Sequence, residues 1–123
     1  MIGAQAAEEA AEAIAALCTG PVLLVAGLGG GTGTGAAPVV ARIATAQGCE
    51  VTAVVTWPFP FEGRRRALLA RRGLTALKAY VPRIVVVKLC ELMPQPPGTR
   101  IRDLYEMADH KAASAVMDTL RPG

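Results

Sequence analysis

The sequence predicts an α/β fold: a small three-layer βαβαβ domain built on a parallel sheet. Three β-like runs, at residues 22–26, 51–56 and 84–87, predict strands, and the first is continuously apolar, as is typical of a parallel strand that is buried on both faces. Segments with apolar residues at helical spacing separate these runs, and this alternation favours right-handed crossovers between parallel strands. A glycine-rich turn follows the first run, at the edge where such sheets bind ligands.

Composition indicates one domain with an aliphatic core. Of the 123 residues, 52% are hydrophobic and 19% are charged, which excludes global disorder. No apolar run is long enough to span a membrane, and the N-terminus lacks the basic start of a signal peptide. Three widely spaced cysteines fit no metal or disulfide pattern, so we expect reduced thiols, a cytoplasmic location and no membrane partner.

The net charge of +3 is unevenly distributed along the chain. Residues 63–90 hold eight basic residues and no acidic one, whereas residues 1–50 are slightly acidic. A basic surface favours an anionic partner, although a solvated helix face would give the same pattern. No base-stacking aromatic residues are interleaved with the basic ones, so nucleic acid is not an expected partner.

The first two helices are expected to have recognisable ends. An Ala- and Glu-rich helix over residues 4–17 stops before Gly20 and Pro21. A second helix is predicted over residues 36–47, with Pro38 in its first turn, where no amide hydrogen bond is lost. The glycines before residue 36 are therefore assigned to a turn.

The second half of the chain is expected to hold two more helices. Two prolines after the second strand keep the following residues out of the sheet. A helix is predicted over residues 62–80 and is stopped by Pro82, and a last helix covers residues 100–120 with a break near Tyr105. The apolar face of the first of these helices has spacings of three and four residues: Ala67, Ala70, Leu74, Leu77 and Val81.

The glycine-rich turn is the strongest functional signal. Six glycines lie between Gly27 and Gly35, so most side chains are missing and backbone N–H groups can converge on one point. The following helix directs the positive end of its dipole at the same point, and the hydroxyls of Thr32 and Thr34 add donors. This combination suits a phosphate group.

Three classes of phosphate loop compete for this turn. A Walker A loop needs a Lys-Ser/Thr pair after its last glycine, whereas Ala36 and Ala37 follow Gly35 here. A Rossmann dinucleotide turn fits the glycine spacing but needs an acid at the end of the next strand, where Thr56 stands. The third class is a lysine-free nucleoside triphosphate loop in which main-chain amides bind the phosphates.

The sequence resembles the tubulin/FtsZ family. The run Gly29–Gly35 is similar to the family's phosphate-loop signature, and residues 36–40 continue in the same way. A second block, from Ala53 to Arg66, is similar to the family's next conserved segment, and the likeness extends over nearly the whole chain. The resemblance implies a partial tubulin/FtsZ GTPase fold, which is Rossmann-like, with GTP or GDP and Mg²⁺ as cofactors.

The resemblance also implies roles for individual residues. The glycine turn would hold the phosphates, Glu62 and Arg66 would lie near the ribose and phosphates, and Tyr105 and Asp109 would hold the guanine. A plain salt bridge between Glu62 and Arg66 is the structural alternative. Where the family has an Asn after the third strand, this chain has Lys88 or Leu89. The implied nucleotide-binding residues are Gly29, Gly30, Gly31, Thr32, Gly33, Thr34, Gly35, Glu62, Arg66, Tyr105 and Asp109.

Compared with the family, we expect residues 1–123 to form a single truncated nucleotide-binding domain. The family's first phosphate loop and its catalytic acidic loop have no counterpart here, so no catalytic residue is predicted and GTP hydrolysis by the chain alone is not expected. The alternative is a non-enzymatic protein that docks on itself or on a full-length FtsZ-like partner. A third interpretation is a degraded gene product whose motifs are no longer used.

Overall fold

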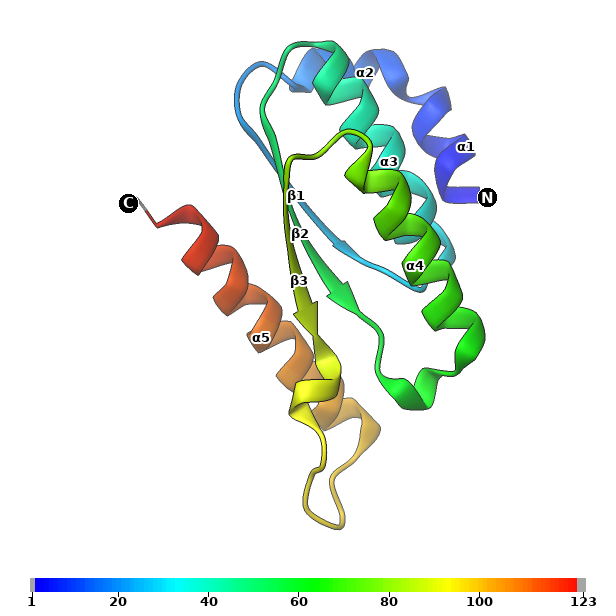
Figure 1. Ribbon diagram of the computed structural model, residues 1–123, viewed down its shortest axis with the longest axis vertical. Helices are drawn as coiled ribbons and strands as arrows, with labels where there is room; N and C mark the ends of the chain where they lie inside the picture. Colours follow the sequence, from blue (N-terminus) through cyan, green and yellow to red (C-terminus); the bar gives the residue numbers. More distant parts are fainter. Residues whose placement is uncertain (1, 122–123) are drawn as a thin grey trace.

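The computed structural model of the chain describes residues 2–121, without the side chains of residues 2–4, 6 and 31–33. Its three strands are parallel and lie in the order β1-β2-β3 (Figure 1). Helices cover both faces of this sheet, which confirms the predicted three-layer α/β fold. The elements are α1 (Ile2–Glu9), α2 (Ala11–Leu17), β1 (Val22–Gly27), α3 (Gly31–Ala46), β2 (Val51–Trp57), the 3-10 turn η1 (Pro60–Glu62), α4 (Arg64–Lys78), β3 (Arg83–Lys88), the 3-10 turn η2 (Leu89–Leu92) and α5 (Ile101–Leu120).

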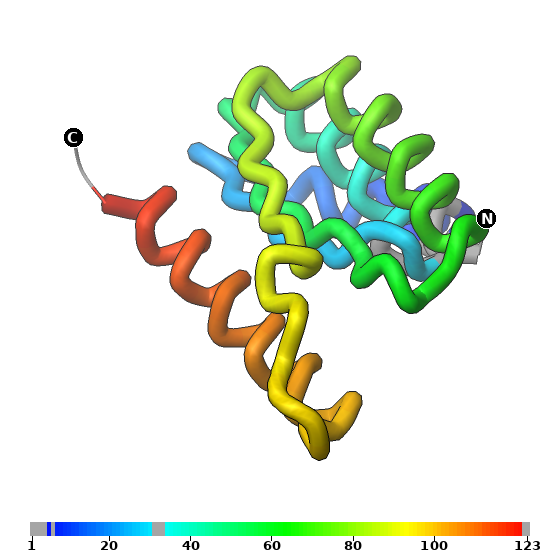
Figure 2. The backbone as a smooth tube through the Cα atoms, turned by 60° about the horizontal axis from the view of Figure 1, so that its bottom comes forward, coloured from blue at the N-terminus to red at the C-terminus, as the bar shows by residue number. Residues whose placement is uncertain are grey.

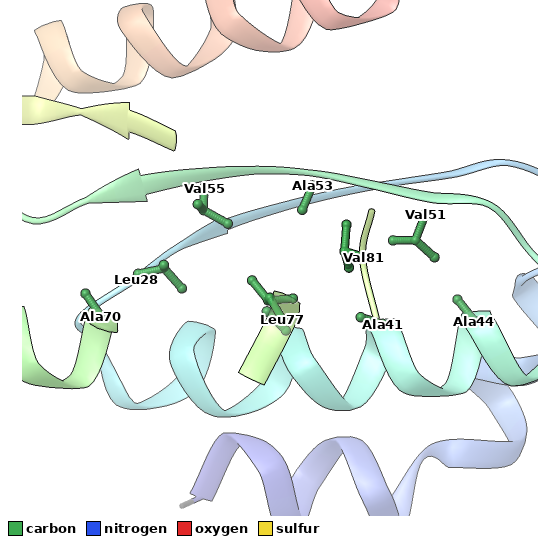
Figure 3. Packing of buried hydrophobic residues seen from close by; sticks show 10 residues of the cluster. Leu28, Ala41, Ala44, Val51, Ala53, Val55, Ala70, Leu77 and Val81 are labelled. Carbon is green, nitrogen blue, oxygen red and sulfur yellow. The ribbon is translucent and has the colours of Figure 1, made fainter. Parts of the chain in front are cut away.

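Helices α3 and α4 cover one face of the sheet, which we call the packed face. Its core consists of small side chains and a few larger ones, such as Ala41, Ala53 and Leu77, all of them fully buried (Figure 3). Small residues allow the helices to approach each other closely. A Cβ atom at Gly73 of α4 would lie only 2.7 Å from the Cγ2 atom of Thr34 in α3. The outer side of α3 packs against α1.

Helix α5 lies alone on the opposite face, which we call the open face (Figure 2). The first half of α5 packs well, and its Leu104 and Ala108 are buried with Val54 and Val87 of the sheet. The cover over β1 is weaker, because the side chain of Val25 is 52% exposed. The C-terminal end of α5 diverges from the sheet (Figure 1).

The predicted start of the second helix is wrong. Helix α3 begins at Gly31 rather than at residue 36, so the glycine turn shrinks to residues 28–30. Pro38 consequently lies inside the helix and cannot donate to the carbonyl of Thr34. Glycine weakens a helix by about 1 kcal/mol per residue, but burial of Thr34 and Gly35 against α4 outweighs this local preference.

Three further expectations need correction. The N-terminal helix is two helices that meet at Ala10. The helix expected over residues 62–80 begins only at Arg64, because Gly63 has a φ of +98° and separates α4 from η1. Helix α5 is continuous through Tyr105, where a break was expected.

Candidate functional site

The turn after β1 is held in one conformation by glycine. Gly29 has a φ of +100°, and a Cβ atom there would lie 3.1 Å from the carbonyl oxygen of Arg66 and 3.2 Å from Cγ of Pro58. Its N–H group donates to the Oγ1 atom of Thr34 at 2.8 Å. Both the backbone angle and the close neighbours therefore require glycine at this position.

Thr34 supports this turn from inside the helix. Its side chain is 1% exposed, its hydroxyl accepts the Gly29 hydrogen bond and its methyl group faces Gly73. The sequence predicts a Thr34 hydroxyl that donates to phosphate, and that role stays a prediction. The geometry also gives Thr34 a structural role, because its hydroxyl holds the turn in its conformation.

The N-terminus of α3 opens beside the turn. Its N-cap is Gly30, which is exposed and makes no side-chain capping hydrogen bond, and a Cβ atom at Gly30 would meet nothing within 4 Å. The first turn of a helix leaves N–H groups without intrahelical acceptors and carries a partial positive charge. A lysine-free anion site can form at such an end. The side chain of Thr32 lies outside the described part of the structure, and Gly31 and Gly33 are described only as backbone of α3.

Glu62 lies after β2, in η1, just as the glycine turn lies after β1. One carboxylate oxygen accepts a hydrogen bond from the N–H group of Phe59 at 2.7 Å, and the other lies 3.2 Å from Nη1 of Arg66. The salt bridge considered as an alternative to a binding role is therefore present. Glu62 is the more buried partner, whereas the guanidinium of Arg66 is more than half exposed and can reach a second anion.

Tyr105 of α5 faces Glu62 across the end of the sheet. Its ring meets the Phe59 ring edge-on, with centroids 5.7 Å apart, and Phe59 stacks on Phe61. The side chain of Tyr105 remains 40% exposed. Partial burial raises the pKa of the Tyr105 phenol, and the Glu62 carboxylate raises it further, while Arg66 has a smaller opposite effect.

These elements enclose a cavity of about 240 Å³ between the carboxyl ends of the strands and α5. Four predicted site residues line it: Gly30, Glu62, Tyr105 and Asp109. Arg66 is not part of the lining and is connected to it through Glu62, and neither Gly29 of the turn nor Gly35 of α3, both buried, lines the cavity. The full lining is Gly27, Leu28, Gly30, Thr56, Pro58, Glu62, Leu89, Tyr105, Ala108, Asp109 and Ala112.

Several lining residues were not predicted as part of the site. Thr56 pairs with Gly27 in the parallel register, so it was identifiable only once the strands were aligned. Ala108 and Ala112 follow Tyr105 at spacings of three and seven, which puts them on the same helix face. Leu89, one of the two residues expected where the family has an Asn, is buried at the cavity.

Metal ions and membranes are two further partners to consider. Among the side chains that the structure describes, no three His, Cys, Asp or Glu residues are grouped as a metal site would require. Within residues 2–121, no helix has the combined length and apolarity needed to cross a bilayer.

Comparison with known proteins decides the family. Residues 1–93 match the tubulin/FtsZ family, GTPase domain. The chain belongs to the tubulin/FtsZ family. It is 40% identical over 120 residues to the cell division protein FtsZ of Buchnera aphidicola subsp. Acyrthosiphon pisum (strain APS), a match that covers 94% of this chain and 31% of that protein.

Solved FtsZ structures show the same architecture. An empty FtsZ dimer from M. jannaschii superimposes with a TM-score of 0.87 and 41% identity, covering 94% of this chain and 34% of that one. The GDP-bound CetZ1 monomer from Haloferax volcanii gives a TM-score of 0.73 at 24% identity, covering 91% of this chain and 36% of that one, and it supports the fold. The chain thus spans about a third of the length of the FtsZ relatives that it matches.

Proposed function

We propose that this FtsZ-family chain binds guanine nucleotide at the cavity between the strand ends and α5. The observation that carries the proposal is the meeting of two parts there: the uncapped N-terminus of α3 on one side, and Tyr105 with Asp109 on the other. The phosphates would lie at Gly29–Gly35 and Arg66, and Mg²⁺ would be held mainly through the phosphates and water. This arrangement separates an anion site from a base site, as a nucleotide requires.

The base site has the chemistry for guanine. The carboxylate of Asp109 can accept hydrogen bonds from both N1–H and the exocyclic amine of guanine, whereas adenine offers no such pair of donors on that edge. The exposed part of the Tyr105 ring can stack on the base. The cavity volume of about 240 Å³ is below the usual range of about 300–1,000 Å³ for ligand pockets, so we expect weak binding.

Calorimetric titration with GDP and ADP tests this proposal. We expect GDP to bind more tightly than ADP, and Asp109→Ala to reduce GDP affinity about tenfold by removing acceptors for guanine. The matched control is Asp118→Ala, at the far end of α5, where the carboxylate forms an ion pair with exposed Arg121. Equal affinity for GDP and ADP, or equal effects of the two substitutions, would contradict the assignment of the base site.

We further propose that the chain alone does not hydrolyse GTP. Two acids line the cavity, Glu62 and Asp109. Glu62 is held by the Phe59 N–H group and by Arg66, and Asp109 is assigned to the base, so neither is assigned to activate a water molecule. Phosphate release from GTP and Mg²⁺ should stay at background, and turnover that disappears in Thr32→Ala would refute this part of the proposal.

A second candidate function is docking on another FtsZ-like chain or on a second copy. It is favoured by the edge of β1, which has no neighbouring strand among the described residues and no charged residue. The edge at β3, by contrast, is bounded by Arg83 and Lys88. Charged residues discourage edge pairing, and their lack permits it. Sedimentation with assembling FtsZ tests this function, and failure to pellet together with a monomeric mass in solution would exclude it.

A further inference from the structure

The outer face of α4 carries a cluster of arginines that the nucleotide proposal does not use. Arg64, Arg65 and Arg71 surround Leu68 and, with Ala67, line a surface hollow of about 460 Å³. Arg72 is exposed next to them. We call Arg64, Arg65, Leu68, Arg71 and Arg72 the arginine patch. The opposite face of α4 is buried in the core, so the patch is the outward side of an anchored helix.

None of the four arginines of the patch has an ion-pair partner within the part of the chain that the structure describes. Four arginines outside the patch do form ion pairs, Arg42 with Glu8, Arg66 with Glu62, Arg100 with Asp103 and Arg121 with Asp118, whereas Arg83 and Arg102 stand singly among the described residues. Residues 63–90 contain no acidic residue, so the chain itself offers the patch little nearby compensation. Four like charges on two turns of a helix repel one another, and an external group of negative charge would relieve this repulsion.

Leu68 gives the patch an apolar centre. Its side chain is 48% exposed, and it is the one large hydrophobic residue exposed on α4, a helix that the structure describes throughout. An apolar contact ringed by arginines resembles the centre of a protein interface more than a merely solvated helix. One leucine provides too little apolar area for insertion into a membrane surface.

We propose that the arginine patch binds an acidic peptide segment of a protein partner, with a large apolar side chain between its carboxylates. Guanidinium groups bind carboxylates through two parallel hydrogen bonds. Arg64 and Arg71 are seven residues apart on a helix, about 10 Å. Acids three residues apart on an extended peptide span about the same distance. Such a segment places its apolar residue over Leu68. This binding does not depend on the nucleotide site.

The experiment uses the full chain and a fluorescein-labelled peptide, Gly-Glu-Asp-Leu-Glu-Asp-Gly, with fluorescence anisotropy as the readout. The double variant Arg65→Glu/Arg71→Glu should bind the peptide at least tenfold more weakly. The control variant Lys78→Glu/Lys88→Glu has the same change in net charge at exposed positions outside the patch, and should change binding less than twofold. Equal weakening in both variants would show a net-charge effect alone and overturn the proposal.

A second arm tests the apolar centre and the rival partner. Leu68→Ala should weaken binding of the leucine peptide several-fold and leave binding of an alanine-substituted peptide unchanged, and an equal effect on both peptides would overturn the proposal.

Vesicles of phosphatidylglycerol test a lipid surface as the rival partner. Tight binding to vesicles without binding to the peptide would also overturn the proposal. Far-UV circular dichroism establishes that each variant is folded.

Discussion

The two faces of the sheet differ in how they are covered, and the difference separates stability from binding. On the packed face, fully buried alanines, Gly73 and Leu77 hold α3 and α4 tightly against the strands. On the open face, the first half of α5 contributes the buried side chains, the second half packs only partly, and Val25 and Leu120 remain more than half exposed. The cavity lies on the open face, beside the end of α5 that is anchored. The packed face therefore determines the fold, while the open face leaves room for a ligand.

The largest effect should come from truncation on the packed face. Leu77→Ala removes a fully buried side chain and leaves a cavity, which we expect to lower the free energy of unfolding by about 2–5 kcal/mol. Chemical denaturation followed by circular dichroism measures the change. A loss under 1 kcal/mol would mean that the packed face is not the more stable half.

The next effect should come from Thr34, where the packed face supports the proposed phosphate loop. Thr34→Val keeps the shape of the side chain but leaves the buried N–H group of Gly29 without its acceptor. The expected cost is about 1–3 kcal/mol of unfolding free energy. Thr34→Ser keeps the acceptor and should cost less than Thr34→Val, so the reverse order would show that the hydrogen bond does not stabilise the turn.

On the open face, the titration of Tyr105 reports on Glu62. Its pKa is raised above 10.0 by burial and by the Glu62 carboxylate, so the phenol stays protonated to higher pH than in the unfolded chain. This contribution to stability is present below pH 10.0 and is lost as the pH rises through the folded pKa.

Ultraviolet absorbance of tyrosinate measures this titration in a Tyr80→Phe background, which leaves Tyr105 as the sole tyrosine. The Tyr105 midpoint should lie above 10.0 and move down in Glu62→Gln, because the negative charge is removed. An unchanged midpoint in Glu62→Gln would mean that Tyr105 and Glu62 do not face each other across the cavity.

The smallest effect is expected at the diverging end of α5. The side chain of Leu120 is 59% exposed, so Leu120→Ala should change the free energy of unfolding by no more than about 0.5 kcal/mol. The same denaturation measurement applies. A loss comparable to that of Leu77→Ala would show that the end of α5 packs against something in solution and that the open face is covered there.

Much of the fold could be predicted from the sequence because its signals are local. The three apolar strands and the buried face that includes Ala70 and Leu77 follow from periodicity alone. The start of α3 could not be predicted this way, because glycine disfavours a helix locally and the compensating contact, Thr34 against Gly73, joins two distant segments. Local sequence preference therefore failed to predict the start of α3, which tertiary packing determines.

The candidate site shows the same division. The family resemblance implied site roles for Glu62, Tyr105 and Asp109, and all three line the same cavity. The pairing of Gly27 with Thr56 and the burial of Leu89 could not be inferred, because both depend on strand register and on the path of η2.

The order of the strands in the sheet is the same as their order in the chain. Each new strand thus pairs with the one that precedes it, and each crossover helix packs beside the previous one. Each pairing closes one crossover unit, from Val22 to Val51 and from Thr52 to Arg83, and no pairing between strands has to close a longer loop. During translation, β1, β2 and β3 would leave the ribosome in the order in which they pair. The partner of each later strand would therefore already be present when that strand emerges.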